Sequence, residues 1–139
     1  MGWRRRFGTT LRAMVCGPED IEKVLSVVGE KDESGRDLRE IFSHVLRHKS
    51  VRILMPTENT LAMFVDFNGK EWDAHFIGTR DTSWMAVKWM FEHEKCEAIS
   101  WLPPTAALKR VARIADKYVG SHRVGDRHYI ERSTVCQQR

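Results

Sequence analysis

Residues 71–102 constrain the fold more than any other part of the chain. Glu71–Ile77 alternates polar and apolar residues, Ser83–His93 is apolar on most sides, and Ala98–Leu102 is a short apolar run. These patterns are typical of a strand, a largely buried helix and a buried strand. A strand, helix and strand with short links form a right-handed crossover. The sequence therefore predicts two parallel strands, adjacent or nearly so, in one sheet.

The residues before this crossover predict a strand, two helices and two further strands. Both helical segments repeat apolar residues along one stripe, and Asn68-Gly69 is a strong hairpin signal. The strands on either side of that pair should therefore be antiparallel. The predicted elements are a strand at Leu11–Cys16, helices over about 19–28 and 36–47, and strands at Val51–Met55 and Thr60–Phe67.

The residues after the crossover predict one helix and two short strands. Pro103-Pro104 ends the preceding strand, Thr105 is a helix-capping residue, and Gly120 suits the end of the helix. The predicted inner stripe of this helix, which runs through Tyr118, is Leu108, Val111, Ala112, Ala115 and Val119. The two strands are predicted at Ser121–Val124 and Arg127–Ile130, followed by a frayed end over residues 131–139.

The predicted fold class is α/β (α+β), with a mixed sheet and the order β-α-α-β-β-β-α-β-α-β-β. A length of 139 residues favours a single domain. We predict a basic N-terminal arm over residues 1–10, a domain over 11–131 and a C-terminal tail over 132–139. Arg4-Arg5-Arg6 supplies the charge of the arm.

Composition and charge narrow the class of protein. Hydrophobic residues make up 42% and charged residues 30%, the balance of a globular chain. No apolar run is long enough to span a membrane, and the three cysteines form no close pair, so we expect a reducing compartment such as the cytoplasm. The net charge of +4 fits nucleic acid, an anionic cofactor such as coenzyme A, or a solvated surface.

The element order over roughly residues 10–131 resembles that of the GNAT (N-acetyltransferase) superfamily. Within it, the segment around His75–Gly125 is similar to short GNAT-like proteins of tailed bacteriophages. The stretches that carry the resemblance read AHFIG, TRDTSWMAVKWMFEH, CEAISWLPP and KYVGSHRVG. The resemblance implies acetyl-CoA as cofactor, an amine as acceptor, and a location in the host cytoplasm or in the virion.

In the GNAT family, a loop of the form (Arg/Gln)-x-x-Gly-x-(Gly/Ala) binds the cofactor pyrophosphate through backbone N–H groups. The matching stretch here is Arg80–Met85, in which Ser83 replaces the first glycine and Met85 the small final residue. Asp81 adds a negative charge that repels phosphate. The alternative is that Thr82 or Ser83 caps a buried helix. The cofactor-binding residues implied by the resemblance are Arg80, Thr82, Ser83 and Trp84.

Amine acetylation needs a base that takes the ammonium proton. The alternation of Glu71–Ile77 places Glu71, Asp73 and His75 on one strand face, and any of the three could serve as that base. The alternative is a solvent-facing or cross-strand polar pair. The tyrosine that is the family's usual general acid is missing, because its position holds Ala115.

Two functional hypotheses follow. The first is an acetyl-CoA-dependent N-acyltransferase, and the second is a catalytically silent GNAT-fold module with protein partners in a phage particle. The basic arm, or a basic helix face, could hold nucleic acid, an adenosine phosphate or an acidic protein surface. No cysteine, histidine and carboxylate set has the spacing of a metal site, so no metal is predicted. The residues of the basic helix face are Lys109, Arg110, Arg113 and Lys117.

Overall fold

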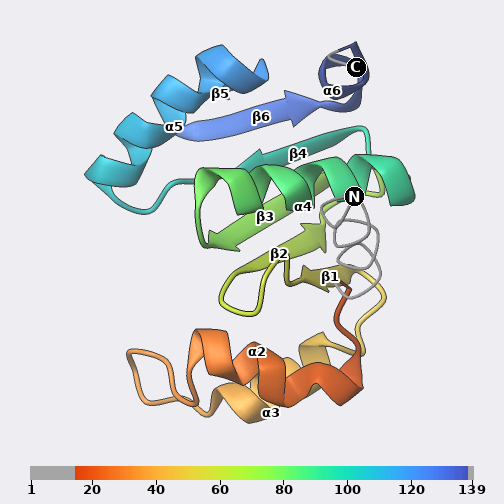
Figure 1. Cartoon of the computed structure of the whole chain (residues 1–139), viewed down its shortest axis with the longest axis vertical. Coiled ribbons are helices and arrows are strands. Elements are labelled where there is room, and N and C mark those ends of the chain that lie inside the picture. Colours follow the sequence, from red (N-terminus) through yellow and green to blue (C-terminus); the bar gives the residue numbers. More distant parts are fainter. Residues whose placement is uncertain (1–14, 138–139) are drawn as a thin grey trace, which may run out of the picture. The chain divides into compact units, whose positions relative to one another are not determined.

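The computed structural model describes residues 15–137, which form a mixed α/β structure with a six-stranded mixed sheet (Figure 1). The strand order in the sheet is β1-β2-β3-β4-β6-β5. The strands are β1 (Val51–Leu54), β2 (Leu61–Asp66), β3 (Glu71–Ile77), β4 (Ala98–Trp101), β5 (His122–Val124) and β6 (Arg127–Glu131). The helices are η1 (Pro18–Asp20), α2 (Ile21–Val28), α3 (Leu38–Val45), α4 (Arg80–His93), α5 (Ala106–Val119) and α6 (Arg132–Gln137).

The described residues divide into two compact units. The first unit contains residues 15–64 and 76–86, and the second contains residues 65–75 and 87–137. The boundary falls within β2, β3 and α4. Among residues 15–137, no helix combines the length and the apolar character needed to cross a bilayer.

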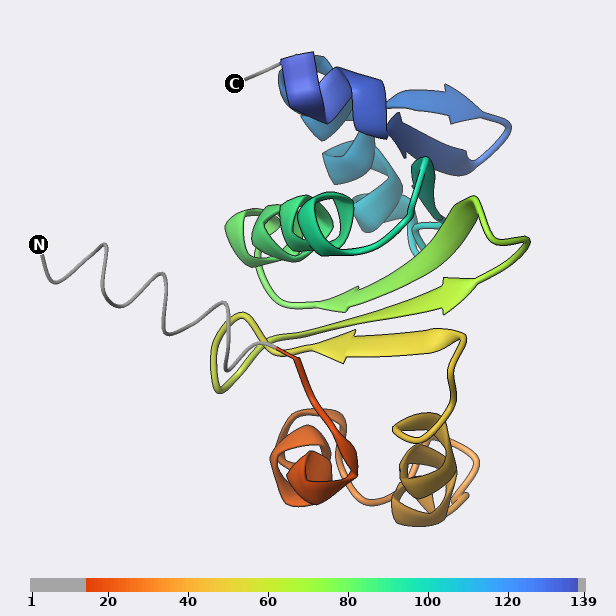
Figure 2. The same cartoon turned by 90° about the vertical axis from the view of Figure 1, so that its right-hand side faces the viewer.

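The first unit has a core built from the apolar stripes of α2 and α3, which lie side by side (Figure 2). Both predicted helices are present, and Gly29 ends α2 as the sequence predicts. Helix α3 is two residues shorter than predicted at each end, and the Asp37 side chain caps its start by accepting from the Arg39 N–H. Of the predicted strand Leu11–Cys16, residues 11–14 lie outside the described residues, and Val15 forms an antiparallel bridge with Leu54. The buried members of this core are Cys16, Val24, Phe42, Ile53, Met55 and Leu61.

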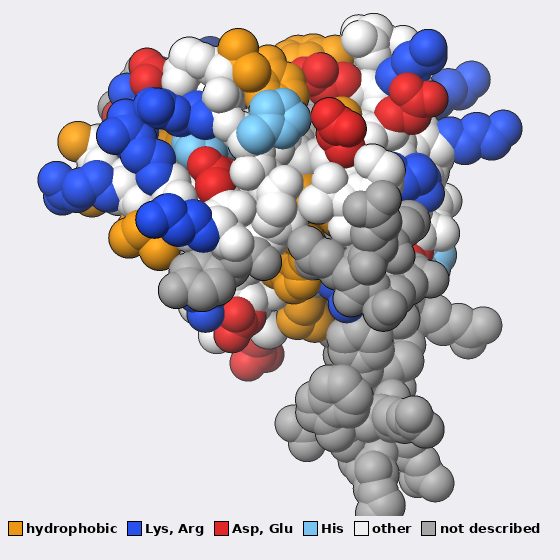
Figure 3. Space-filling view, turned by 90° about the horizontal axis from the view of Figure 1, so that it is seen from above, with side chains coloured by type: hydrophobic (Ala, Val, Ile, Leu, Met, Phe, Trp, Pro, Cys, Tyr) orange, Lys and Arg blue, Asp and Glu red, His pale blue; other side chains and the backbone are white. Residues whose placement is uncertain are grey.

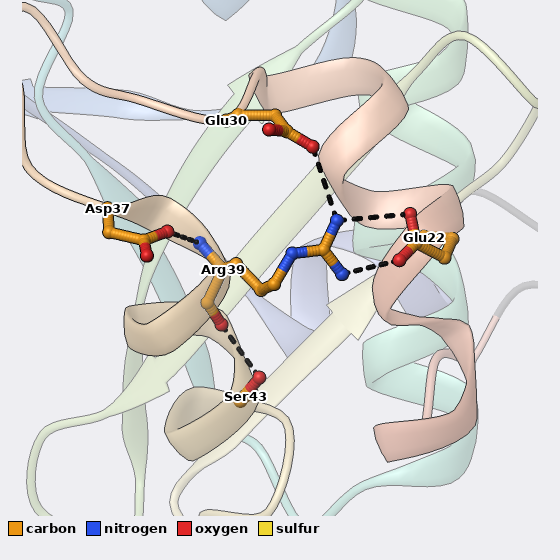
Figure 4. Close-up of polar contacts among 5 residues, drawn as sticks. All are labelled: Glu22, Glu30, Asp37, Arg39 and Ser43. Carbon is orange, nitrogen blue, oxygen red and sulfur yellow. Dashed lines mark hydrogen bonds and ion pairs between the residues drawn. The ribbon is translucent and has the colours of Figure 1, made fainter.

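An exposed ion-pair cluster joins α2 to α3 in the same unit (Figure 4). The Arg39 guanidinium donates to the Glu22 carboxylate, and its Nη2 lies 3.2 Å from Glu30 Oε1. The hydrogen bond from Arg39 lowers the pKa of Glu22 below its ordinary value. Because all three side chains are solvent-exposed, the cluster adds little stability.

The second unit contains the parallel strand pair of the predicted crossover. β3 and β4 are parallel neighbours, with Asp73 opposite Ser100, so the prediction from residues 71–102 is confirmed. Before β3, Asn68 Oδ1 accepts from the N–H groups of Lys70 and Glu71 and closes the predicted hairpin turn. The part of α4 in this unit is largely buried through Val87, Trp89, Met90 and Phe91.

A buried polar pair connects helix α5 to β6. The two oxygens of Asp116 on α5 lie 2.9 and 3.0 Å from Nδ1 of His128 on β6, and His128 is buried. Ala112 is the buried apolar residue on α5. The predicted inner stripe is wrong at Leu108 and Val111, which are 48% and 53% exposed. Asp116 lies on the inner side instead, because the buried imidazole needs a hydrogen-bond partner.

The C-terminal residues differ from their prediction. The sequence predicts a frayed end, whereas Arg132–Gln137 forms the short helix α6. Arg132 lies at the start of α6, and its guanidinium donates to the carbonyls of Phe91, Glu94 and Cys96. These carbonyls lie around the end of α4, where a cation is favoured. Contacts between residues this far apart in sequence leave no local periodic signal.

Candidate functional site

The first candidate site is the polar face of β3 in the second unit. Glu71, Asp73 and His75 alternate along the strand with the buried Trp72 and Ala74. The three side chains therefore share one face, as the sequence predicts. Their catalytic role stays a prediction.

Two further residues join this face to β4 and β6. Arg127 Nη1 donates to Asp73 Oδ1 at 2.7 Å and to Ser100 Oγ at 3.0 Å. Ser100 Oγ in turn donates to Glu71 Oε2 at 2.9 Å. Asp73 thus contacts the guanidinium directly, and Glu71 is connected to it through the Ser100 hydroxyl. With two carboxylates and one guanidinium, this face attracts a cation such as an ammonium group. We call Glu71, Asp73, His75, Ser100 and Arg127 the sheet network.

His75 is the most accessible member of the sheet network. Its Nε2 lies 2.8 Å from Asp73 Oδ2, and its side chain is 61% exposed, against 13% for Asp73. His75 and Asp73 therefore form an ion pair when the imidazole is protonated. This arrangement suits a group that exchanges protons with a solvent-borne molecule.

Sequence reasoning missed Ser100 and Arg127. The sequence predicts a buried apolar strand over residues 98–102 and places Arg127 at the start of a short strand. A serine inside a buried strand is the available signal, because a buried hydroxyl needs a partner. Nothing in the sequence pairs Arg127 with Asp73, 54 positions away. Tyr129 is the register partner of Ser100, so it lies on the same sheet face.

A separate candidate site is the first turn of α4 in the first unit. The sequence predicts a loop here and a helix from Ser83, but α4 begins at Arg80. The reason is a reciprocal cap: Thr79 Oγ1 accepts from Thr82 N at 3.2 Å, and Thr82 Oγ1 accepts from Thr79 N at 3.0 Å. The capping alternative thus describes this turn better, with Thr79 as the capping residue.

The first turn of α4 fits a pyrophosphate group poorly. The Thr82 N–H is bonded to the Thr79 side chain, and the Ser83 N–H donates to the Thr79 carbonyl at 3.0 Å. Of the three backbone donors that the resemblance assigns to phosphate, at Thr82, Ser83 and Trp84, the first two are therefore in use. Arg80 is exposed, but its Nε lies 3.7 Å from Asp81 Oδ1, so a carboxylate already partners it. Trp84 follows in the same helical turn.

A hollow of about 670 Å³ in the second unit is a weaker candidate. It is lined by residues 92–97 with Gly69, Lys70 and Arg132, and its acidic and basic side chains are balanced. Cys96 lies at its base and is 1% exposed. Burial raises the pKa of this thiol to about 12. Cys96 therefore stays protonated at neutral pH and is a poor nucleophile.

Within residues 15–137, no three histidine, cysteine, aspartate or glutamate side chains are grouped so that they could hold a metal ion. No protein-family model matches the sequence, and a comparison with curated proteins finds no match.

Proposed function

We propose that this protein is a catalytically silent, GNAT-like binding module. The observation that carries the proposal is the reciprocal Thr79–Thr82 cap, which uses the Thr82 N–H, one of the backbone donors that a cofactor pyrophosphate would need. A fold does not fix a function, and a superfamily architecture can persist without its catalytic machinery. Ser83 in place of the first glycine and Met85 in place of the small final residue support the same conclusion.

The GNAT-like part of the proposal is supported by the element order and by the parallel pair. The helices α2 and α3 precede β1, β2 and β3, and α4 links β3 to the adjacent parallel β4. Helix α5 and the hairpin of β5 and β6 follow. This is the order that the sequence resemblance implies for residues 15–131.

Calorimetry with acetyl-CoA and with desulfo-CoA tests the proposal. We expect no saturable heat at high micromolar ligand, because the first turn of α4 offers few unused donors. The matched variant is Arg80→Ala, which removes the one family-like side chain of the turn. Micromolar binding that Arg80→Ala weakens would overturn the proposal.

A second candidate function is N-acyl transfer to an amine, and the sheet network favours it. Its carboxylates would attract an ammonium group, and Nδ1 of His75, with Asp73 fixing the ring, would take the proton. Thiol release from acetyl-CoA in the presence of polyamines and peptide N-termini measures this activity. Turnover that His75→Gln abolishes, while the exposed-surface variant His48→Gln leaves it intact, would favour the enzyme over the binding module.

The partner that we propose is a protein, in the phage particle that the resemblance implies. Co-sedimentation of the purified chain with virions and with duplex DNA, over a salt series, distinguishes protein docking from nucleic-acid binding. Docking on protein predicts retention on virions at a salt concentration that releases the chain from DNA, because DNA affinity falls steeply with salt. A chain that stays in the supernatant at low salt would contradict docking.

A further inference from the structure

Helix α5 carries an exposed apolar stripe in the second unit. Leu108, Val111 and Ile114 are 48%, 53% and 58% exposed, and they follow one another at intervals of three residues. Residues three or four apart are neighbours on a helix surface, so the three side chains form one continuous strip. A helix in a soluble domain normally turns such residues inward.

The stripe is left outside because α5 packs through its other side. Ala112 and Asp116 face the sheet, and the Asp116 carboxylate is bonded to the buried His128. His128 is stacked on Trp101, with ring centroids 5.8 Å apart. The orientation of α5 is therefore fixed by this buried pair, and the apolar stripe cannot rotate inward without breaking it.

Basic side chains flank the stripe. Arg110 lies one turn before Ile114 and Lys117 lies one turn after it, with Arg113 beside them, and all three are exposed. The acidic residue of this helix, Asp116, is turned inward to His128. Figure 3 shows lysine and arginine side chains gathered beside apolar ones on the side where α5 lies in Figure 1.

We propose that the stripe and its basic flank, Leu108, Arg110, Val111, Arg113, Ile114 and Lys117, form a docking surface for an acidic, amphipathic protein segment. The apolar strip would bury against the partner's apolar face, and the basic flank would pair with its carboxylates. A second copy of this chain is disfavoured, because two such flanks repel each other. Nucleic acid is disfavoured as the partner because phosphate contacts supply most of the affinity of proteins for nucleic acid. The aliphatic side chains of the stripe make no favourable contact with phosphates.

This docking surface would be the one that the proposed binding module uses, so the inference rests on the proposed function. Its test uses no acetyl-CoA, so the two can fail separately. The probe is a fluorescein-labelled helical peptide of about 18 residues, with leucine at i, i+3, i+4 and i+7 and glutamate elsewhere. Fluorescence anisotropy measures its binding to the full chain.

We expect saturable micromolar binding that weakens about tenfold in the double variant Val111→Ser/Ile114→Ser, since a few central residues carry most interface energy. Arg110→Gln/Arg113→Gln should weaken binding as well and reduce its salt dependence. Both sites are exposed, so the fold should survive, and circular dichroism checks this. Matched controls are Ile41→Ser and Arg47→Gln, two exposed residues in the first unit, which should leave the affinity unchanged.

Four results would overturn the proposal. The first is no saturable binding of the peptide, and the second is equal binding of a scrambled peptide of the same composition. The third is stronger retention on anionic phosphatidylglycerol vesicles or on duplex DNA than on the peptide. The fourth is a dimer in sedimentation velocity that Val111→Ser/Ile114→Ser dissociates, which would make a second copy of the chain the occupant.

Discussion

The sheet network and the first turn of α4 organise their polar groups by opposite means. In the second unit, Arg127 and Ser100 connect side chains from three strands, and Asp73 and Arg127 are 54 positions apart in sequence. In the first unit, Thr79 and Thr82 are three positions apart and bond to each other's backbone. The network leaves an exposed histidine available to solvent, whereas the cap consumes the donors that it contains.

This difference separates what the two regions can do. The sheet network holds polar side chains that face outward, so it can bind a cationic ligand whether or not a cofactor binds. A local cap satisfies the helix terminus from within, so it removes the site that anions use in other proteins. The polar face of the sheet thus presents a solvent-exposed histidine, whereas the N–H groups of Thr79, Thr82 and Ser83 in the first turn of α4 are already hydrogen-bonded.

The largest expected effect comes from breaking the network at its centre. Arg127→Met leaves the partly buried carboxylate of Asp73 without its cation and Ser100 Oγ without a donor. We expect the free energy of unfolding in urea to fall by about 2–4 kcal/mol. The control is Arg123→Met on β5, an exposed arginine, which should change it by less than about 0.5 kcal/mol. Equal losses in the two variants would contradict the account of the network.

The second effect tests the turn that leads into the α4 cap. Gly78 has a φ of +151°, and a Cβ there would lie 2.6 Å from Thr82 Oγ1 and 2.8 Å from Thr60 Cγ2. Gly78→Ala should therefore cost about 1–3 kcal/mol in thermal or urea unfolding. Gly35→Ala is the control, because Gly35 also has a positive φ but nothing within 4 Å. A smaller loss of stability in Gly78→Ala than in Gly35→Ala would contradict the close approach of Thr82 and Thr60 to Gly78.

The third effect tests the cap alone. Thr79→Ala should lower the free energy of unfolding by about 1 kcal/mol, as removal of a helix cap does. Thr105→Ala on α5 is a matched control, because Thr105 Oγ1 accepts from Leu108 N at 3.1 Å in the same way. Similar losses in the two variants, with recovery in Thr79→Ser, are the expected result. No loss in Thr79→Ala would mean that the turn is not closed by this residue.

The smallest effect concerns the exposed cluster of Figure 4, which is neither a long-range buried network nor a cap. Arg39 lowers the pKa of Glu22, so the ion pair stabilises the fold above the ordinary pKa of glutamate and is lost as the pH falls through the lowered value. In an NMR titration, Arg39→Gln should raise the pKa of Glu22 towards its ordinary range. Arg47→Gln should leave it where it is in the wild type. No change in Arg39→Gln would contradict the pairing.

Local signals in the sequence were sufficient for most of the fold. Asn68-Gly69, the Thr105 cap and the alternation of Glu71–Ile77 each depend on residues close in sequence, and each is found in the structure. The sequence predicts the start of α4 three residues too late. The helix is capped by Thr79 and begins at Arg80, before the apolar run from Trp84 onward that defines the predicted helix. Apolar periodicity predicts Leu108 and Val111 on the inner side of α5. It cannot predict that Asp116 turns inward, because the partner of Asp116 is the buried His128 on another element.

Some residues of the sheet network could likewise be predicted from local sequence patterns, and others could not. The shared face of Glu71, Asp73 and His75 follows from the two-residue period of a strand, so the sequence was enough to predict it. Ser100 and Arg127 enter only through the pairing of β3, β4 and β6, and strand pairing is a tertiary property. Long-range partners of this kind have no spacing that one sequence reveals.

The backbone amides of Thr82 and Ser83 give the most direct test of the closed turn. Their ¹⁵N–¹H resonances can be followed by NMR while coenzyme A is added to the wild-type chain. The account predicts that both resonances stay in place up to about millimolar ligand, because their donors are bonded to Thr79. Saturable shifts of these two amides at micromolar coenzyme A would contradict it.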